Sequence, residues 1–174
     1  ATEVCGFDVN TMRKILVHLI NRALVEVAGE GRYTLHALVA DYATNLLSES
    51  ESREGHFRHS KYFLKITQQY TSNNMKEWHM LDSDWNNIRL SANWLSANTN
   101  FSAADQKTLQ LVADFALALD VIVQARKPVE SLSWLQVGAT ACQHLGRLQD
   151  EGWLLLTIGN VELDKGLFDE AIKH

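Results

Sequence analysis

The sequence predicts a mainly α-helical fold with one short β-hairpin, in which antiparallel helix pairs stack on one another. Apolar residues recur at three- and four-residue spacing along most of the chain, which is the pattern of amphipathic helices. A single proline, Pro128, leaves long helices uninterrupted. The glycine-containing turn at 28–31 separates two short β-type runs, which predicts the hairpin near residues 24–35.

Residues 1–48 form the first predicted module. Asp8 or Asn10 can cap a helix whose apolar stripe begins at Met12, and the hairpin follows this helix. A second helix then carries apolar residues at helical spacing, namely Leu38, Val39, Tyr42, Ala43, Leu46 and Leu47. A helix, a hairpin and a helix in this order are typical of the last part of a winged-helix domain, so we expect a winged-helix remnant.

Residues 49–102 are predicted to form a helical spacer. The stretch 48–55 is rich in serine and glutamate, so we expect it to be the loop that joins two modules. From His56 onward the apolar spacing indicates one helix after another, with polar turns at 71–74 and 98–102. The tryptophans fall at helical spacing, which favours core packing over an aromatic ligand groove; they are Trp78, Trp85, Trp94, Trp134 and Trp153.

Residues 103–174 are predicted to form stacked helix pairs. Long apolar helices are expected at about 103–125, 128–146 and 148–166, with Pro128 in the first turn of the second one. A final helix begins at Leu167 and runs to the last residue. We expect the chain to be a segment of a longer protein, because it opens directly before a helix and stops inside one.

The end of this region resembles the tetratricopeptide repeat in the stretch Ile158-Gly159-Asn160 … Gly166-Leu167-Phe168-Asp169-Glu170-Ala171-Ile172. Gly159 would let two helices approach closely, and Gly166 would allow the tight turn between them. Phe168 and Ala171 would pack back on the first helix of the pair. The preceding pair, about 103–146, has the right length for a degenerate repeat but lacks the small residues of the signature. An ordinary helical hairpin is the alternative.

The hairpin and its flanks resemble the winged-helix region of STAND signalling ATPases, the bacterial relatives of NB-ARC and AP-ATPase switch proteins. The first part of the likeness is Leu16-x-x-Leu19-Ile20-x-Arg22-Ala23-Leu24-Val25. The second is Gly31-Arg32-Tyr33-Thr34-Leu35-His36-Ala37-Leu38-Val39-Ala40-Asp41-Tyr42-Ala43. Later runs are similar to the helical spacer of bacterial members, namely Arg58-His59-Ser60-x-Tyr62-Phe63-Leu64 and Asp84-Trp85-x-Asn87-Ile88-Arg89 … Trp94-Leu95.

This resemblance implies a nucleotide-controlled switch. An upstream ATPase module would bind ADP or ATP, the winged helix would pack on it, and the repeats would sense a partner. A histidine in the position of His36 would reach the nucleotide phosphate, and its imidazole can donate to a phosphate oxygen. Ala37 stands where the family has aspartate and Ala40 where arginine is usual. The alternative is that His36 only packs and hydrogen-bonds locally.

Composition and motifs argue against several other functions. A net charge of −5 disfavours non-specific binding of nucleic acid. Cys5 and Cys142 match no metal or redox spacing and indicate reduced thiols in a cytoplasmic protein. We expect no membrane span, since no apolar run of about 18 residues lacks a charge. The sequence holds no Gly-x-x-x-x-Gly-Lys-Ser/Thr loop. We therefore expect no catalysis and no bound cofactor in this chain, with any ATPase activity in an upstream domain.

Two stretches of the sequence resemble metal-binding sites only weakly. His56 and His59 are three residues apart on an expected helix, but two ligands make a poor site. The stretch 82–86 imitates the start of a calcium loop, yet Asn87 replaces the required glycine and Asn93 the required glutamate. We expect no metal site.

Three functional hypotheses remain. In the first, the chain is the non-catalytic regulatory part of a STAND-type signalling protein, whose helical repeats bind a protein or peptide. In the second, it belongs to a transcription regulator whose winged helix contacts DNA through Arg13, Lys14 and Arg22, while the repeats bind an inducer. In the third, it is part of an enzyme with catalytic residues elsewhere.

Overall fold

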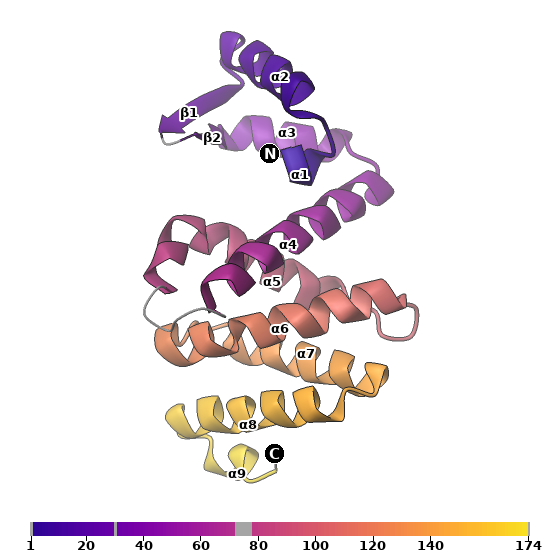
Figure 1. Cartoon of the computed structure of the whole chain (residues 1–174), viewed down its shortest axis with the longest axis vertical. Helices are drawn as coiled ribbons and strands as arrows, with labels where there is room; N and C mark the ends of the chain where they lie inside the picture. Colours follow the sequence, from indigo (N-terminus) through magenta and orange to yellow (C-terminus); the bar gives the residue numbers. More distant parts are fainter. Residues whose placement is uncertain (1, 30, 72–77, 174) are drawn as a thin grey trace. The chain divides into compact units, whose positions relative to one another are not determined.

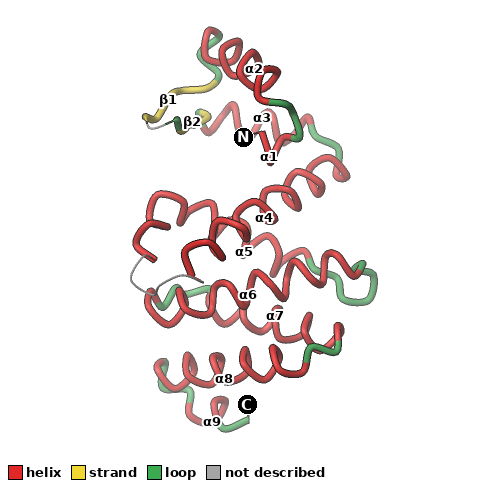
Figure 2. Tube along the Cα trace, in the orientation of Figure 1, coloured by secondary structure: helices red, strands yellow, loops and turns green. Residues whose placement is uncertain are grey.

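The chain is mainly helical, as the sequence predicts, and contains a small two-stranded antiparallel sheet in the part that the structure describes (Figure 2). A computed structural model describes residues 2–29, 31–71 and 78–173. The chain divides into two compact units, Ala1–His59 and Ser60–His174, which are described separately.

The first unit contains the predicted helix, hairpin and helix, preceded by a short additional helix. Its elements are α1 (Thr2–Cys5), α2 (Val9–Asn21), β1 (Val25–Gly29), β2 (Arg32–Leu35) and α3 (Ala37–Leu46). Asp8 caps α2, because its carboxylate accepts from the backbone N–H groups of Asn10 at 2.9 Å and Thr11 at 3.0 Å. The hydroxyl and backbone N–H of Thr11 are the main causes that hold the pKa of Asp8 below its usual value.

The hairpin lies where the sequence predicts it. Val25 pairs with Leu35 and Val27 with Tyr33 in antiparallel register, and an irregularity follows between Val27 and Gly29. Gly29 and Gly31 both have positive φ, which suits glycine because it lacks a Cβ. The glycine turn therefore acts as expected.

The prediction of a loop at 48–55 is wrong, because α4 (Glu49–Thr71) begins directly after Ser48. The Ser48 hydroxyl and backbone N–H both donate to the Glu51 carboxylate, at 2.6 and 2.9 Å, and the Glu51 N–H donates back at 3.3 Å. This reciprocal arrangement is a capping box, which satisfies N–H groups that a helix start leaves unpaired. The polar composition that suggested a loop is the signal of a helix start.

The second unit holds the end of α4 and a series of helices that lie side by side in sequence order (Figure 1). They are η1 (Trp78–Asp84), α5 (Trp85–Asn98), α6 (Gln106–Arg126), α7 (Ser131–Leu145), α8 (Leu148–Asp164) and α9 (Phe168–Ala171). Of the predicted turns, 98–102 falls at the end of α5, while 72–74 lies outside the described residues.

Local signals account for most of these boundaries. Asp105 caps α6 by accepting from the Thr108 N–H at 2.7 Å. α6 ends at Lys127, which has a left-handed backbone, and Gly146 ends α7 in the same conformation. Pro128 does not lie in the first turn of α7 as predicted. It precedes the helix, and its carbonyl accepts from the N–H of Ser131, where α7 begins.

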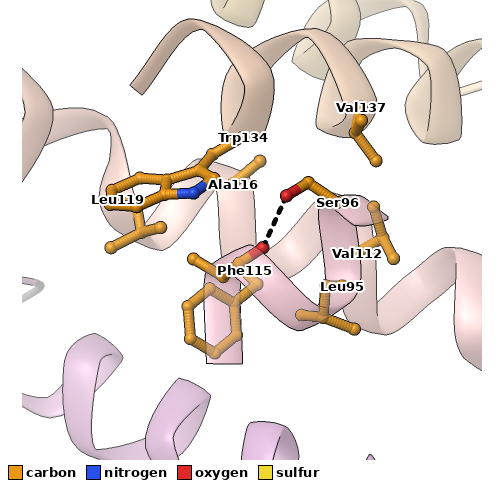
Figure 3. A pocket seen from close by; sticks show the side chains of 9 residues that line it. Leu95, Ser96, Val112, Phe115, Ala116, Leu119, Trp134 and Val137 are labelled. Atoms are coloured by element: carbon orange, nitrogen blue, oxygen red, sulfur yellow. Dashed lines mark hydrogen bonds between the residues drawn. The ribbon is translucent and has the colours of Figure 1, made fainter. Parts of the chain in front are cut away.

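The core of the second unit lies between α6, α7 and α8. Phe115, Leu119, Leu135, Leu154 and Ile158 are at most 1% exposed. Figure 3 shows side chains of α5, α6 and α7, among them Leu95, Phe115 and Trp134, around a small void in this core. The volume of the void is only about 10 Å³. Such tight packing is typical of a folded protein interior.

The tryptophans differ in their surroundings. Trp134 is 3% exposed, donates its indole N–H to Asn93 at 2.7 Å and meets the ring of Trp85 edge-on. Core packing is therefore confirmed for Trp134, and Trp85 is half-buried beside it. Trp153 is 55% exposed, so the prediction is wrong for that residue. The spacing of tryptophans along the sequence does not show that Trp153 lies on the exposed side of α8.

The pair α6–α7 contains small residues at its contact, which the sequence analysis did not single out in 103–146. A Cβ placed on Gly138 would lie 2.1 Å from the Cβ of Ala116 and 3.6 Å from its Cα. No side chain larger than hydrogen fits there without moving a helix. The close approach of α6 and α7 therefore depends on this glycine and alanine.

One helix of the described part, α6, is long and apolar enough to cross a membrane by length and composition. Within its most apolar window, 61% of the residues are buried inside the fold. A buried core helix passes the same test, so this feature is weak evidence for a membrane span.

Candidate functional site

The first candidate surface is the apolar side of α3, here called the α3 face and consisting of Leu38, Tyr42 and Leu46. These side chains are 73%, 67% and 67% exposed, and no residue of α3 is buried. Their four-residue spacing places them on one side of the helix. Large apolar side chains that lie together on one side of a helix and that the described residues leave exposed are typical of an interaction site.

His36 lies at the start of α3 and acts as its N-cap. Its Nδ1 accepts from the Leu38 N–H at 3.3 Å, and the residue is exposed. The local hydrogen bond of the alternative interpretation is thus present, although the side chain is not packed. With Nδ1 used as an acceptor, Nε2 is the ring atom that can donate to a ligand. His36 therefore caps α3 through its side chain.

The repeat signature is only partly assembled at the contact between α8 and α9. A Cβ on Gly159 would lie 3.6 Å from the carbonyl oxygen of Ala171, so these two positions meet as expected. Gly166 has φ of +76° in the turn between the helices. Phe168 is 62% exposed and does not pack back on α8, which contradicts the prediction. A four-residue helix makes little more than one turn, so only its side near Ala171 meets α8.

A buried carboxylate joins α6 to α8. Asp120 is 4% exposed and accepts from the Thr157 hydroxyl at 2.5 Å, the Trp153 indole N–H at 2.9 Å and the Gln124 amide at 3.1 Å. Buried polar groups need such partners, because desolvation is otherwise costly. The network holds the exposed Trp153 ring in one orientation. The sequence signal for this buried network was Asp120 itself, an aspartate within an otherwise apolar helix.

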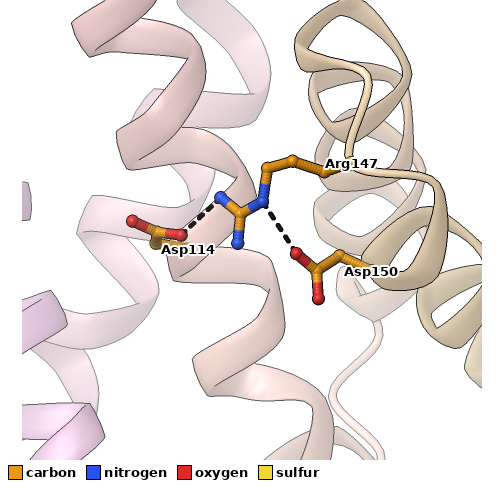
Figure 4. A network of polar contacts seen from close by, with 3 residues as sticks. All are labelled: Asp114, Arg147 and Asp150. Carbon is orange, nitrogen blue, oxygen red and sulfur yellow. Dashed lines mark hydrogen bonds and ion pairs between the residues drawn. The ribbon is translucent and has the colours of Figure 1, made fainter.

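A second polar link ties the start of α8 to the middle of α6, as Figure 4 shows. The Arg147 guanidinium contacts Asp114 through Nη1 at 2.6 Å and Asp150 through Nε at 2.7 Å. Burial lowers the pKa of Arg147, but the bonds to Asp114 and Asp150 outweigh it and raise that pKa above its ordinary value. Both acids are already engaged, so this cluster serves the fold.

Another candidate site is a cavity of about 470 Å³ where the end of α6, the start of α7 and the end of α8 meet. We call it the end cavity. Its polar lining residues are Gln124, Lys127, Ser131, Asn160, Asp164 and Lys165. Lys127 Nζ pairs with Asp164 Oδ2 at 2.7 Å. The sequence did not predict this site, because its residues are contributed by three separate segments.

Two kinds of reactive group, thiols and clusters of metal ligands, are relevant to possible chemistry in the described residues. Cys142 is fully buried, and burial is the main cause that raises the pKa of its thiol, so it is a poor nucleophile. In the described ranges, no group of three His, Cys, Asp or Glu side chains could hold a metal ion. His56 and His59 lie on α4 without a third ligand of this kind.

Comparison of the chain with protein-family models, with curated proteins and with solved structures found no match. The function must therefore be argued from the surfaces themselves.

Proposed function

We propose that this chain is a non-catalytic regulatory and protein-interaction segment of a STAND-type signalling NTPase. In this proposal the first unit is a winged-helix remnant that docks on a nucleotide-binding module of the same protein. The second unit is a tetratricopeptide-like array that binds a protein or peptide. ADP and ATP would act in the complete protein, in the cytoplasm, and His36 Nε2 would donate to a nucleotide phosphate.

The exposed α3 face carries the proposal. Burying an exposed leucine is worth about 2 kcal/mol, so leaving three large apolar side chains in water is unfavourable unless a partner covers them. The helix and the hairpin before it have the order of elements found at the end of a winged helix. A module that docks on α3 would also lie near His36, one residue before the helix begins.

The second unit supports the interaction role. Its helices follow one another as neighbours, with α6 against α7 and α7 against α8, as repeats that stack to bury a common core do. Repeat arrays of this kind offer surfaces rather than reaction centres. The exposed Trp153, fixed by Asp120, is one feature such a surface can present to a partner.

The test uses the complete gene product. We expect a phosphate-binding loop motif upstream of this segment, and its absence would refute the STAND proposal. Leu38→Ser with Tyr42→Ser should speed the exchange of bound ADP by about tenfold or more, because the docked state loses apolar contacts. Leu90→Ser is the matched control, since Leu90 is also half exposed but lies on α5. Equal exchange rates in both variants would contradict docking through α3.

A separate measurement tests each of the two alternative hypotheses. A transcription regulator should show salt-dependent DNA binding that is lost on substitution of Arg13 and Arg22. An enzyme should show turnover by the chain alone, where we expect ATP hydrolysis no faster than in a heat-treated control.

A further inference from the structure

The end cavity combines a positive charge, apolar walls and a buried hydroxyl for which the described residues offer no hydrogen-bond partner. We propose that it binds a carboxylate group of a peptide, and this inference rests on the proposed role of the second unit in peptide binding. The site lies at the end of the helix stack, and the groups that form it come from α6, α7 and α8.

The charge of the cavity favours an anion. Lys127 and Asp164 pair with each other, and Lys165 has no acidic partner within salt-bridge distance among the described residues. The lining therefore carries one uncompensated positive charge. The nearby Glu130 does not reduce it, because its carboxylate pairs with Arg89, whose hydrogen bond is the main cause of its lowered pKa.

The start of α7 adds to this preference. α7 has 15 residues, and the Glu130 side chain makes no capping hydrogen bond at its start. Helix N-termini carry partial positive charge and bind anions. A carboxylate in the end cavity would lie where Ser131 begins this helix.

Ser131 supplies an independent reason to infer a ligand. The residue is 0% exposed, it lines the cavity, and its hydroxyl has no hydrogen-bond partner among the described residues. Burying a hydroxyl without a hydrogen-bond partner is unfavourable, so such groups are rare in folded proteins. An incoming carboxylate oxygen would accept from this hydroxyl and remove the penalty.

The remaining walls favour a peptide over a free phosphate. Val123, Val161 and Leu163 give the cavity an apolar side, which suits the aliphatic part of an acidic residue or of its neighbour. Gln124 uses its amide N–H on Asp120, so its carbonyl oxygen can accept from a peptide N–H. Asp164 would repel a dianion more strongly than a single carboxylate.

The test measures binding to the intact chain by titration calorimetry and by backbone amide shifts of Ser131 and Lys165. The probes are N-acetyl-Leu-Glu-Leu-amide, the same peptide with glutamine in place of glutamate, N-acetyl-Leu-Leu with a free C-terminal carboxylate, and inorganic phosphate. The first and third probes distinguish a side-chain carboxylate from a C-terminal one. Lys165→Gln and Ser131→Ala are the test variants, and Lys107→Gln, an exposed lysine outside the cavity, is the charge-matched control.

We expect at least one carboxylate peptide to shift both amides, and the glutamine peptide to leave them unchanged. Lys165→Gln should weaken binding about tenfold, which is the effect of losing one charge-assisted contact, and Lys107→Gln should not. Shifts of equal size with the glutamine peptide, equal affinities of the two lysine variants, or tighter binding of phosphate would each overturn the site. The nucleotide-exchange result for the α3 face is independent of these titrations, so the site can fail while the proposed function stands.

Discussion

Single residues decide how closely the helices of the second unit approach. Gly138 lies against Ala116 where α6 and α7 meet, and a Cβ at position 138 would lie 2.1 Å from the Ala116 Cβ. Asp120 fixes α6 to α8 in a different way, through hydrogen bonds from neutral donors. Both features lie in the core, where a change of one methyl group or one hydroxyl alters stability.

Gly138→Ala is expected to lower the free energy of unfolding by about 1–3 kcal/mol, because the added methyl forces α6 and α7 apart. This loss occurs although alanine favours a helix over glycine by about 1 kcal/mol. Gly152→Ala on α8 is the matched control, since a Cβ there meets nothing within 4 Å, and it should stabilise the chain. Urea unfolding at 25 °C measures both. Adding Ala116→Gly to Gly138→Ala should restore part of the loss, and equal effects of the two glycine variants would contradict the packing argument.

Two buried hydroxyls should respond in opposite directions to removal. Thr157→Val takes a donor from the buried Asp120 carboxylate and is expected to cost about 1–3 kcal/mol. Ser131→Ala removes a hydroxyl that has no hydrogen-bond partner in the described part of the chain, so it should leave stability unchanged or raise it by up to about 1 kcal/mol. Denaturant midpoints compare the two variants. A loss on Ser131→Ala as large as that on Thr157→Val would show that the Ser131 hydroxyl is bonded in the free chain.

At the scale of elements, helix starts follow local rules. α2 begins at Asp8, α4 at Ser48 and Glu51, and α6 at Asp105, and each carboxylate accepts hydrogen bonds at the helix start. These bonds hold the pKa values of the three acids below their usual range. A lowered pKa in the folded state means that the ionised acid stabilises the fold.

Asp105→Ala should lower stability by about 1 kcal/mol at neutral pH, because α6 loses its N-cap. The backbone N–H of Thr108 is the main cause that lowers the pKa of Asp105. The cap is therefore fully effective above the ordinary pKa of 3.8 and is lost as the pH falls through the lower pKa of the folded state. The difference between wild type and variant, measured by urea unfolding from pH 7 downward, should shrink below pH 4. Asp105→Asn is the control, because asparagine can cap the helix but does not titrate. If the difference in unfolding free energy between wild type and Asp105→Ala stayed constant with pH, the ionised carboxylate would not be the source of the cap's effect.

At the scale of the whole molecule, the two units differ in how much they bury. The second unit holds most of the buried side chains, including all those that are fully enclosed, whereas Met12 and Val25 are the buried apolar residues described before α4. Local stability follows buried apolar contacts, so the first unit should open more readily. Its exposed α3 face is the surface on which we propose that a partner docks.

The two cysteines of the chain give one thiol probe in each unit. Cys5 is exposed in α1, and Cys142 is fully buried in α7, where burial raises the pKa of its thiol. We expect the Cys5 thiol to react at once with a disulfide reagent. The Cys142 thiol should react only at the rate at which the second unit opens. A Cys5→Ser variant assigns the fast reaction. Rapid labelling of both thiols in the native chain would show that the core between α6, α7 and α8 is loose.

The helices, the hairpin and most of their ends were determined by the sequence alone. Apolar spacing located α2, α3 and α5 to α8, and Gly146 and Asp8 marked ends that depend only on neighbouring backbone. The start of α4 differs from the predicted loop although Ser48 and Glu51 carry the signal of a capping box, because loops and helix starts share a polar, serine-rich composition. These features are local, since a cap or a turn involves residues within one helical turn.

Only the tertiary structure decided which residues meet across helices and which remain in water. Gly138 opposite Ala116, Asp120 with Thr157, the end cavity and the exposure of Trp153 and Phe168 all depend on segments distant in sequence. Apolar spacing shows that a helix has a buried side, but not which neighbour covers it or whether the neighbour reaches far enough. The α3 face illustrates this, because its stripe predicts burial and the described fold leaves it exposed.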